Sequence, residues 1–302
     1  MSRPLSLAPV NGTHLHFQRL GRGPDVVLVH GLAANLAFWY LKAVPALASE
    51  RRVTVYDLRG HGRSAMPAGG YSPAVMAEDL GALLDHLGIG CVDLVGHSFG
   101  GAVALEYTAR HPGRVRTLTL ADATVYSLQP LDSGHDWSYW DAWRRELDSL
   151  GIALPKDLPK VAYGLLEEIA DPRWREARQR RHSGEFFVPF GLWNGARRTA
   201  ERWLQLLRTT AAWKELHEGG LGLEEIRRVD HPTLLIFGER SRWLGTCRLL
   251  QDAMPRAETI IVPGAGHFFP LLKPALFLGH LRAFLERVGA DRGVPAERRA
   301  QQ

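Results

Sequence analysis

The chain contains very little cysteine, with two residues among 302, and this scarcity excludes a small fold held together by disulfide bonds. Cysteine and histidine never cluster at the spacing of a structural zinc site, so the sequence predicts no metal ion. A run of about 18 apolar residues is also absent, which excludes an ordinary transmembrane helix. The first 17 residues lack a continuous apolar stretch, so we expect no signal peptide and a cytoplasmic location.

Lysine is scarce as well, and almost all of the basic side chains are arginines. The net charge is +5 and the isoelectric point is about 9.4, but the sequence has no dense basic tract and no nucleic-acid-binding motif. These features argue against nucleic acid as a partner. A hydrophobic content of 45% and a charged content of 23% are ordinary for a soluble globular enzyme.

Short apolar runs alternate with segments of helical periodicity along most of the chain. The runs typical of buried strands are 14–20, 25–29, 53–56, 92–95, 115–120, 233–237 and 259–262. Helical segments fall between some of them, at 72–87, 101–110 and 274–288. This alternation predicts an α/β fold with a doubly wound, mostly parallel sheet, whose ligands bind at the carboxyl ends of the strands.

Residues 125–228 break this alternation, because they contain no convincing buried strand and seven of the nine tryptophans. We interpret them as a helical cap inserted into a core formed by residues 1–124 and 229–288. Most of the tryptophans then pack between helices, and some line a pocket above the strand ends. Residues 289–302 are polar and are expected to form a flexible tail.

Arginines concentrate in one part of this cap, between residues 173 and 214, and include Arg178 and Arg181. The simplest interpretation is a solvated helix face. The alternative is a docking face for an anionic partner, such as a substrate carboxylate, the phosphates of coenzyme A or an acidic carrier protein.

Ser98 lies where the apolar run at 92–95 meets a helical segment, within Gly96-His97-Ser98-Phe99-Gly100. A tight turn from strand to helix needs small residues on both sides of the serine, and two glycines provide them. The hydroxyl then stands at the carboxyl end of the strand, beside a helix N-terminus whose N–H groups stabilise negative charge. We therefore predict that Ser98 is a nucleophile rather than an incidental serine in a glycine-rich turn.

A serine nucleophile needs a base, and His267 is the candidate among 13 histidines. It ends the glycine-rich stretch Gly264-Ala265-Gly266-His267, just after the last predicted strand, which places it at the same edge of the sheet as Ser98. His97 is too close to Ser98 along the chain to be the obvious base.

Two backbone N–H groups are expected to form an oxyanion hole. One belongs to Phe99, the residue after the nucleophile. The other belongs to Leu32, in the loop that follows the predicted strand at 25–29 and begins His30-Gly31.

Together these segments resemble the α/β-hydrolase superfamily. The resemblance rests on four motifs: His30-Gly31, Asp57-Leu58-Arg59-Gly60-His61-Gly62-Arg63-Ser64, Gly96 to Gly101, and Gly264 to His267. In that family the second motif shapes a loop near the site and carries no chemistry. A serine nucleophile argues against the dehalogenase and epoxide-hydrolase members, which use aspartate there. The resemblance implies a Ser–His–acid mechanism without a metal or organic cofactor.

The acid departs from the family pattern. Relatives usually carry it in the loop after the penultimate strand, where this chain has Ser241, and a serine cannot offset the charge of an imidazolium. Asp122 is the expected replacement, because it ends the strand that follows the nucleophile's helix, where certain polyketide-pathway thioesterases place their acid. Glu239, two positions before Ser241, is the alternative acid.

The resemblance implies a serine hydrolase that cleaves a small carboxylic ester or thioester through an acyl-enzyme on Ser98. A carbon–carbon bond hydrolase acting on a diketone, or a cofactor-free perhydrolase, would use the same residues under a different cap pocket. A non-catalytic ligand-binding homologue is the alternative from another class, and Ser241 in place of aspartate is its only support.

Overall fold

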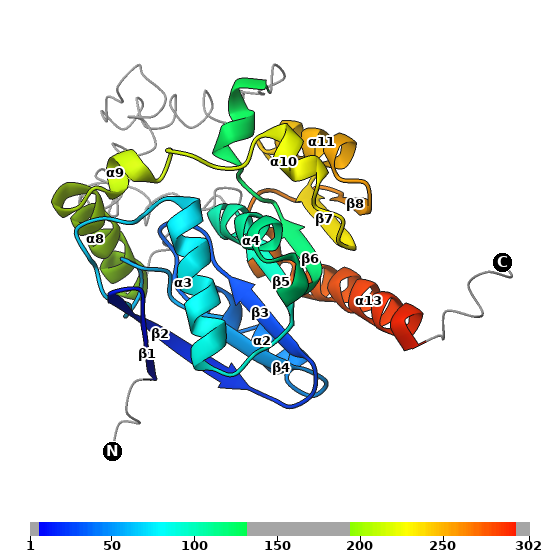
Figure 1. The fold of residues 1–302 in the computed structure, drawn as a ribbon, viewed down its shortest axis with the longest axis horizontal. Coiled ribbons are helices and arrows are strands. Elements are labelled where there is room, and N and C mark those ends of the chain that lie inside the picture. Colours follow the sequence, from blue (N-terminus) through cyan, green and yellow to red (C-terminus); the bar gives the residue numbers. More distant parts are fainter. Residues whose placement is uncertain (1–5, 132–193, 294–302) are drawn as a thin grey trace, which may run out of the picture.

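One mixed sheet forms the centre of the computed structural model, which describes residues 6–131 and 194–293 (Figure 1). The strands are β1 (Leu7–Val10), β2 (Thr13–Leu20), β3 (Asp25–Val29), β4 (Arg52–Tyr56), β5 (Val92–His97), β6 (Val115–Ala121), β7 (Thr233–Gly238) and β8 (Ala257–Val262). Their order across the sheet is β1-β2-β4-β3-β5-β6-β7-β8. The strands β1 and β2 pair antiparallel with each other, β2 pairs antiparallel with β4, and all further pairs are parallel.

Helices connect these strands. Within the described residues they are α1 (Ala37–Tyr40), α2 (Ala43–Leu47), α3 (Pro73–His86), α4 (Phe99–Arg110), α8 (Asn194–Thr209), α9 (Ala212–Glu215), α10 (Leu223–Arg227), α11 (Leu244–Ala253), α12 (Phe269–Leu272) and α13 (Pro274–Gly293). Short 3-10 turns lie at η1 (Pro112–Arg114) and η2 (Tyr126–Leu131). The start of α3 follows from its sequence, because the Ser72 side chain caps the Val75 N–H and Pro73 occupies the first turn.

Both faces of the sheet are covered, which explains why its strands read as continuous apolar runs. In β3, Val27 and Val29 belong to the core cluster beneath α3 and α4, whereas Val26 and Leu28 belong to the cluster beneath α2 and α13. Side chains alternate between the two faces of a strand, so a strand buried on both faces needs apolar residues at every position.

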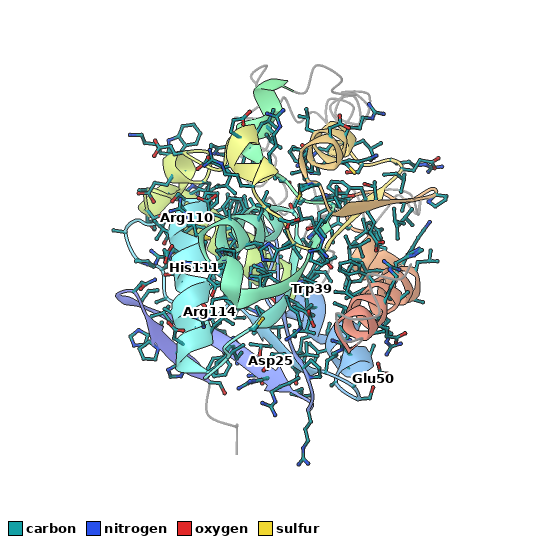
Figure 2. All side chains as sticks on the ribbon, turned by 45° about the vertical axis from the view of Figure 1, so that its right-hand side comes forward. Asp25, Trp39, Glu50, Arg110, His111 and Arg114 are labelled. Carbon is teal, nitrogen blue, oxygen red and sulfur yellow. The ribbon has the colours of Figure 1, made fainter. Side chains whose placement is uncertain are left out.

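The core cluster beneath α2 and α13 contains Trp39, which is labelled in Figure 2. Its ring is 1% exposed and lies 5.4 Å from the ring of Phe277 on α13, measured between centroids. On the other side of the sheet, Arg114 joins η1 to the end of α3 by donating to the Asp85 carboxylate at 2.8 Å. Figure 1 shows α3 and α4 side by side over this side of the sheet.

The expected fold class is confirmed: the sheet is doubly wound and mostly parallel, with helices on both faces. The sequence patterns named none of β1, α1, α2, α11 and α12. All of these except α11 have only four or five residues, too few to show a helical or strand period. The helix α13 continues to Gly293, beyond the boundary at residue 288 drawn from the sequence, and the domain boundaries remain predictions.

The described parts of the expected cap, residues 125–131 and 194–228, contain helices and no strand. Residues 132–193 lie outside the described residues, and with them Arg178 and Arg181. The helix α8 packs on the core: Trp203 and Leu206 are buried, and Arg202 donates a hydrogen bond to the Ser64 carbonyl. In the part of the chain that the structure describes, no helix is both long and apolar enough to cross a membrane.

Candidate active site

Ser98 occupies the turn between β5 and α4, with a strained backbone. Its φ of 54° and ψ of −127° lie outside the regions that side-chain-bearing residues usually adopt. The flanking glycines are required by space. A Cβ on Gly96 would lie 2.3 Å from the Gly100 carbonyl oxygen, and a Cβ on Gly100 would lie 2.5 Å from the His30 carbonyl oxygen. Strand, turn and helix therefore approach each other closely enough to present the Ser98 hydroxyl at the sheet edge.

Three side chains that are far apart in the sequence meet at this edge. The His267 Nε2 atom lies 3.1 Å from Ser98 Oγ, and His267 Nδ1 lies 2.8 Å from Asp122 Oδ1. An ionised carboxylate only accepts hydrogen bonds, so Nδ1 carries the ring proton and Nε2 is left to accept the Ser98 hydroxyl. The arrangement is that of a nucleophile, a base and an acid that orients the base.

The Asp122 carboxylate is completely buried and is held from two sides. Its side chain is 0% exposed, and its backbone has a φ of 48° directly after β6. The Gly238 N–H donates to Oδ2 at 2.8 Å, and the Ser241 hydroxyl donates to Oδ1 beside the His267 ring. A buried charge is tolerated only when hydrogen bonds replace its water, and these three donors do so. Neither Gly238 nor Ser241 was predicted as a partner of Asp122 from the sequence.

Glu239, the alternative acid, takes a different direction. Its exposed carboxylate accepts the Gly264 N–H at 2.7 Å, within the loop that leads to His267. Among the described residues, the carboxylate that lies within hydrogen-bond distance of the His267 ring belongs to Asp122.

The loop after β3 lies directly against the nucleophile. A Cβ on Gly31 would lie 2.8 Å from Ser98 Cβ, so only glycine fits there. The next residue, Leu32, therefore begins beside Ser98, and Phe99 is the first residue of α4, where helix N–H groups have no acceptor within the helix. The two expected oxyanion donors thus belong to backbone segments that adjoin Ser98.

Asp57 holds this loop in place, consistent with a structural role for the motif at 57–64. Its buried carboxylate accepts the Leu36 N–H at 2.7 Å, the Arg63 N–H at 2.8 Å and the His16 ring at 2.8 Å. Burial alone would raise the pKa of Asp57, but the hydrogen bonds from His16 and the backbone outweigh it and hold the pKa below its usual value. Asp57 therefore stays ionised and connects three segments.

His97 supports the loop of the base. Its Nε2–H donates to the His267 carbonyl oxygen at 3.0 Å, and its ring stacks on Phe38 with 4.5 Å between centroids. Burial lowers the pKa of His97 well below its usual value, so the ring is neutral. The sequence placed His97 beside the nucleophile but assigned it no role. His97 is the last residue of β5 and directly precedes Ser98, and this adjacency is the signal that could have indicated it.

Thr124 is a further neighbour of the nucleophile that the sequence analysis missed. Its hydroxyl lies 3.3 Å from Ser98 Oγ, and its N–H donates to the Ser98 carbonyl at 3.0 Å. It stands two residues after Asp122, so one short segment contacts both His267 and Ser98. That spacing could have indicated it.

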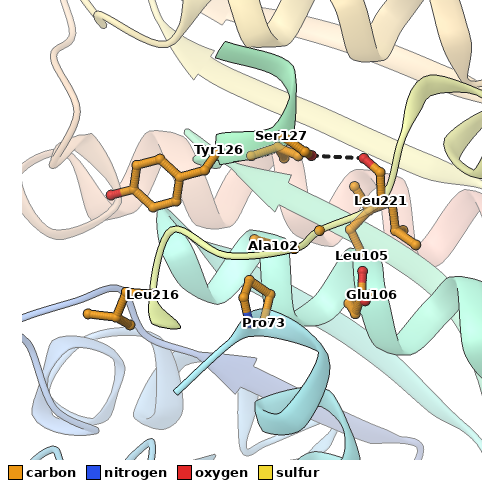
Figure 3. A pocket seen from close by; sticks show the side chains of 11 residues that line it. Pro73, Ala102, Leu105, Glu106, Tyr126, Ser127, Leu216 and Leu221 are labelled. Carbon is orange, nitrogen blue, oxygen red and sulfur yellow. Dashed lines mark hydrogen bonds between the residues drawn. The ribbon is translucent and has the colours of Figure 1, made fainter. Parts of the chain in front are cut away.

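A small hollow lies away from these groups, between α4 and the segment at 216–221 (Figure 3). Its volume of about 10 Å³ is enough for about one water molecule. Its lining includes Leu105, Glu106 and Tyr126 and contains none of Ser98, Asp122 and His267. The described residues also contain no group of three or more side chains suited to a metal ion.

Comparison with known families decides the classification. Residues 24–274 match the family model of the alpha/beta hydrolase fold, which covers most of the chain. The chain belongs to the alpha/beta hydrolase family.

Relatives of this alpha/beta hydrolase catalyse more than one reaction. It is 30% identical over 288 residues to a 2-hydroxymuconate semialdehyde hydrolase from Pseudomonas sp. (strain CF600), with 92% of each chain covered. It is 29% identical over 284 residues to a pimeloyl-[acyl-carrier protein] methyl ester esterase from Aeromonas hydrophila, covering 89% of this chain and 95% of the relative. Both relatives are hydrolases, and their substrates differ.

The fold has solved counterparts. The crystal structure of the carboxylesterase CesB from Bacillus subtilis superposes with a TM-score of 0.69, covering 94% of this chain and 92% of CesB. The sequence identity is 20%, so this likeness concerns the fold alone.

Proposed function

We propose that this alpha/beta hydrolase cleaves a carboxylic ester or thioester through an acyl-enzyme on Ser98. The observation that carries the proposal is the hydrogen-bonded chain from Ser98 Oγ through His267 to Asp122, with distances of 3.1 and 2.8 Å. An esterase among the relatives supports the ester as substrate class.

The first half-reaction forms the acyl-enzyme. Ser98 Oγ attacks the carbonyl carbon while its proton passes to His267 Nε2, and the carbonyl oxygen becomes an oxyanion. The N–H groups of Leu32 and Phe99 stabilise that oxyanion, and loss of one such donor typically costs about 10²–10³ in kcat. The intermediate then collapses, and His267 returns the proton to the departing alcohol or thiol.

Hydrolysis of the acyl-enzyme regenerates the enzyme. A water molecule gives its proton to His267 Nε2 and attacks the acyl carbonyl, and Ser98 Oγ leaves with that proton as the carboxylic acid is released. The buried Asp122 carboxylate stabilises the imidazolium in both halves, because the ion pair at Nδ1 is shielded from water.

The second candidate is hydrolysis of a carbon–carbon bond in a diketone, favoured by the 2-hydroxymuconate semialdehyde hydrolase among the relatives. A panel of p-nitrophenyl esters, acyl thioesters and an unsaturated diketone, compared by kcat/KM, separates the two. Highest kcat/KM for the diketone would replace the ester proposal with this one.

The decisive variant is Ser98→Ala, which removes the hydroxyl and leaves the turn in place. Turnover of every substrate in the panel should disappear, since the corresponding loss in a serine protease is about 10⁶ in kcat. A fluorophosphonate probe should label the parent and not the variant, while the melting temperatures of the two proteins agree. Turnover within a few-fold of the parent would remove Ser98 from the mechanism.

A further inference from the structure

The turn that follows β7 contains Ser241, whose hydroxyl is held by hydrogen bonds to its neighbours. Ser241 is 7% exposed, and its N–H donates to the Gly238 carbonyl at 2.9 Å, which closes a turn directly after the strand. Its Oγ accepts the Trp243 N–H at 3.0 Å and lies against Asp122 Oδ1. Backbone bonds on both sides of Ser241 therefore fix where its hydroxyl stands.

The direction of the Ser241–Asp122 hydrogen bond follows from this arrangement. The Trp243 N–H can only donate, so it occupies a lone pair of Ser241 Oγ. The ionised Asp122 carboxylate can only accept, so the hydroxyl hydrogen points to Oδ1. Asp122 Oδ1 thus accepts from Ser241 and from His267 Nδ1 at once, while Oδ2 accepts from the Gly238 backbone.

We propose that Ser241 is a positioning residue of this active site: its hydroxyl fixes the Asp122 carboxylate in the orientation that His267 Nδ1 requires. The residue at the usual position of the acid has become the support of an acid on the neighbouring strand. The inference rests on the function proposed for Ser98, His267 and Asp122, and it assigns to Ser241 a contribution to that reaction.

Two consequences follow for a variant without this hydroxyl. A buried carboxylate that loses one donor is held less firmly, so His267 spends less time in the productive orientation and kcat falls. Without the Ser241 donor, the negative charge of the Asp122 carboxylate is less compensated and interacts more strongly with His267. The imidazolium form of His267 becomes more stable, and the acid limb of the pH profile moves to higher pH.

The groups around His267 and Asp122 allow this shift to be read cleanly. His97, from the end of β5, has its pKa lowered well below its usual value by burial. Cys247, on α11, faces Asp122, and burial, with a contribution from the Asp122 charge, raises the pKa of its thiol to about 12. Arg242 lies over the Trp243 ring at 4.5 Å and stays charged. None of these three groups changes protonation near neutral pH, so they do not obscure the titration of His267.

The experiment is a graded series at position 241, with ester hydrolysis measured across pH. Ser241→Ala should lower kcat about tenfold with KM within about twofold, and should raise the acid-limb midpoint of kcat/KM by about half a pH unit. Ser241→Thr keeps the hydroxyl and should restore both values to near those of the parent. Ser241→Cys keeps a weak donor and should fall between alanine and threonine. Ser127→Ala is the matched control: it removes a hydroxyl that donates to the Leu221 carbonyl, away from Ser98, and should leave both values unchanged.

A measurement without substrate separates this inference from the proposed function. The His267 ring is titrated by NMR in the parent, Ser241→Ala and Ser241→Thr, and the midpoint should be higher in the alanine variant alone. Equal midpoints in parent and alanine variant, or a lower one in the alanine variant, would overturn the role of Ser241. Equal losses for alanine and threonine would overturn it too, because the hydroxyl would then be irrelevant. A parent without hydrolase activity would refute the proposed function, while the titration would still decide the inference.

Discussion

The ends of β6 and β7 are neighbours in the sheet, yet they are built differently. At the end of β6, the chain turns with Asp122 at a φ of 48° and buries its carboxylate completely. At the end of β7, Gly238 is followed by a turn whose N–H groups bond to the β8 end and to the loop of His267. The Glu239 N–H donates to Val262 at 3.0 Å and the Arg240 N–H donates to Ala265 at 2.8 Å. The end of β6 supplies the carboxylate, and the end of β7 supplies the hydrogen-bond donors that hold it.

The comparison shows that the carboxylate at the end of β6 depends on hydrogen-bond donors from the end of β7. Only glycine fits at position 238, because a Cβ there would lie 2.4 Å from the Ala265 carbonyl oxygen in the loop of His267. The close approach of β7 to that loop places the Gly238 N–H within 2.8 Å of Asp122 Oδ2.

The largest expected effect tests the β6 end. Asp122→Asn keeps the shape but removes the charge that stabilises the imidazolium, and the same exchange in a serine protease costs about 10⁴ in kcat. The variant should retain the melting temperature of the parent within a few degrees and should lose kcat by several orders of magnitude. Steady-state kinetics with the best ester of the panel measures it. A loss smaller than about tenfold would mean that Asp122 is not the acid.

Moving the acid to the β7 end gives a smaller and opposite effect. In Asp122→Ala/Ser241→Asp, the new carboxylate extends into the space that Asp122 Oδ1 occupied, next to His267 Nδ1. It should recover about tenfold in kcat relative to Asp122→Ala, because the charge returns in an imperfect orientation. The matched control is Asp122→Ala/Ser241→Asn, which has the same shape without the charge. If the two double variants had equal kcat values, the two strand ends would not be interchangeable.

The smallest expected effect concerns Glu239. Its carboxylate is exposed and accepts one backbone N–H, from Gly264, and the amide oxygen of glutamine can accept it as well. Glu239→Gln should therefore keep kcat within about twofold and the free energy of unfolding within about 0.5 kcal/mol. Kinetics and denaturant unfolding of the variant measure the two quantities. A greater loss of kcat for Glu239→Gln than for Asp122→Asn would identify Glu239 as the acid.

The alternation of apolar runs with helical segments was sufficient to predict the doubly wound sheet, because that pattern is local and repeats along the chain. The turn at Ser98 was equally legible, since strand, turn and helix are consecutive and the glycines at 96 and 100 satisfy a local steric demand. Short elements such as β1 and α1 were not legible. They form because the rest of the fold offers them a partner, and four residues carry no period of their own.

Within the site, the sequence by itself determined which residues had the right chemistry at the strand ends: a serine in a glycine turn, a histidine after the last strand and two candidate acids. Only the tertiary structure shows which of those two carboxylates contacts the His267 ring. Asp122 and His267 are 145 positions apart in the chain, and their contact depends on how β6, β7 and β8 lie side by side. The hydrogen bonds of Ser241, Thr124 and His97 depend on the same packing. Hydrogen bonds act over about 3 Å, and only the folded sheet brings groups so distant in sequence within that range.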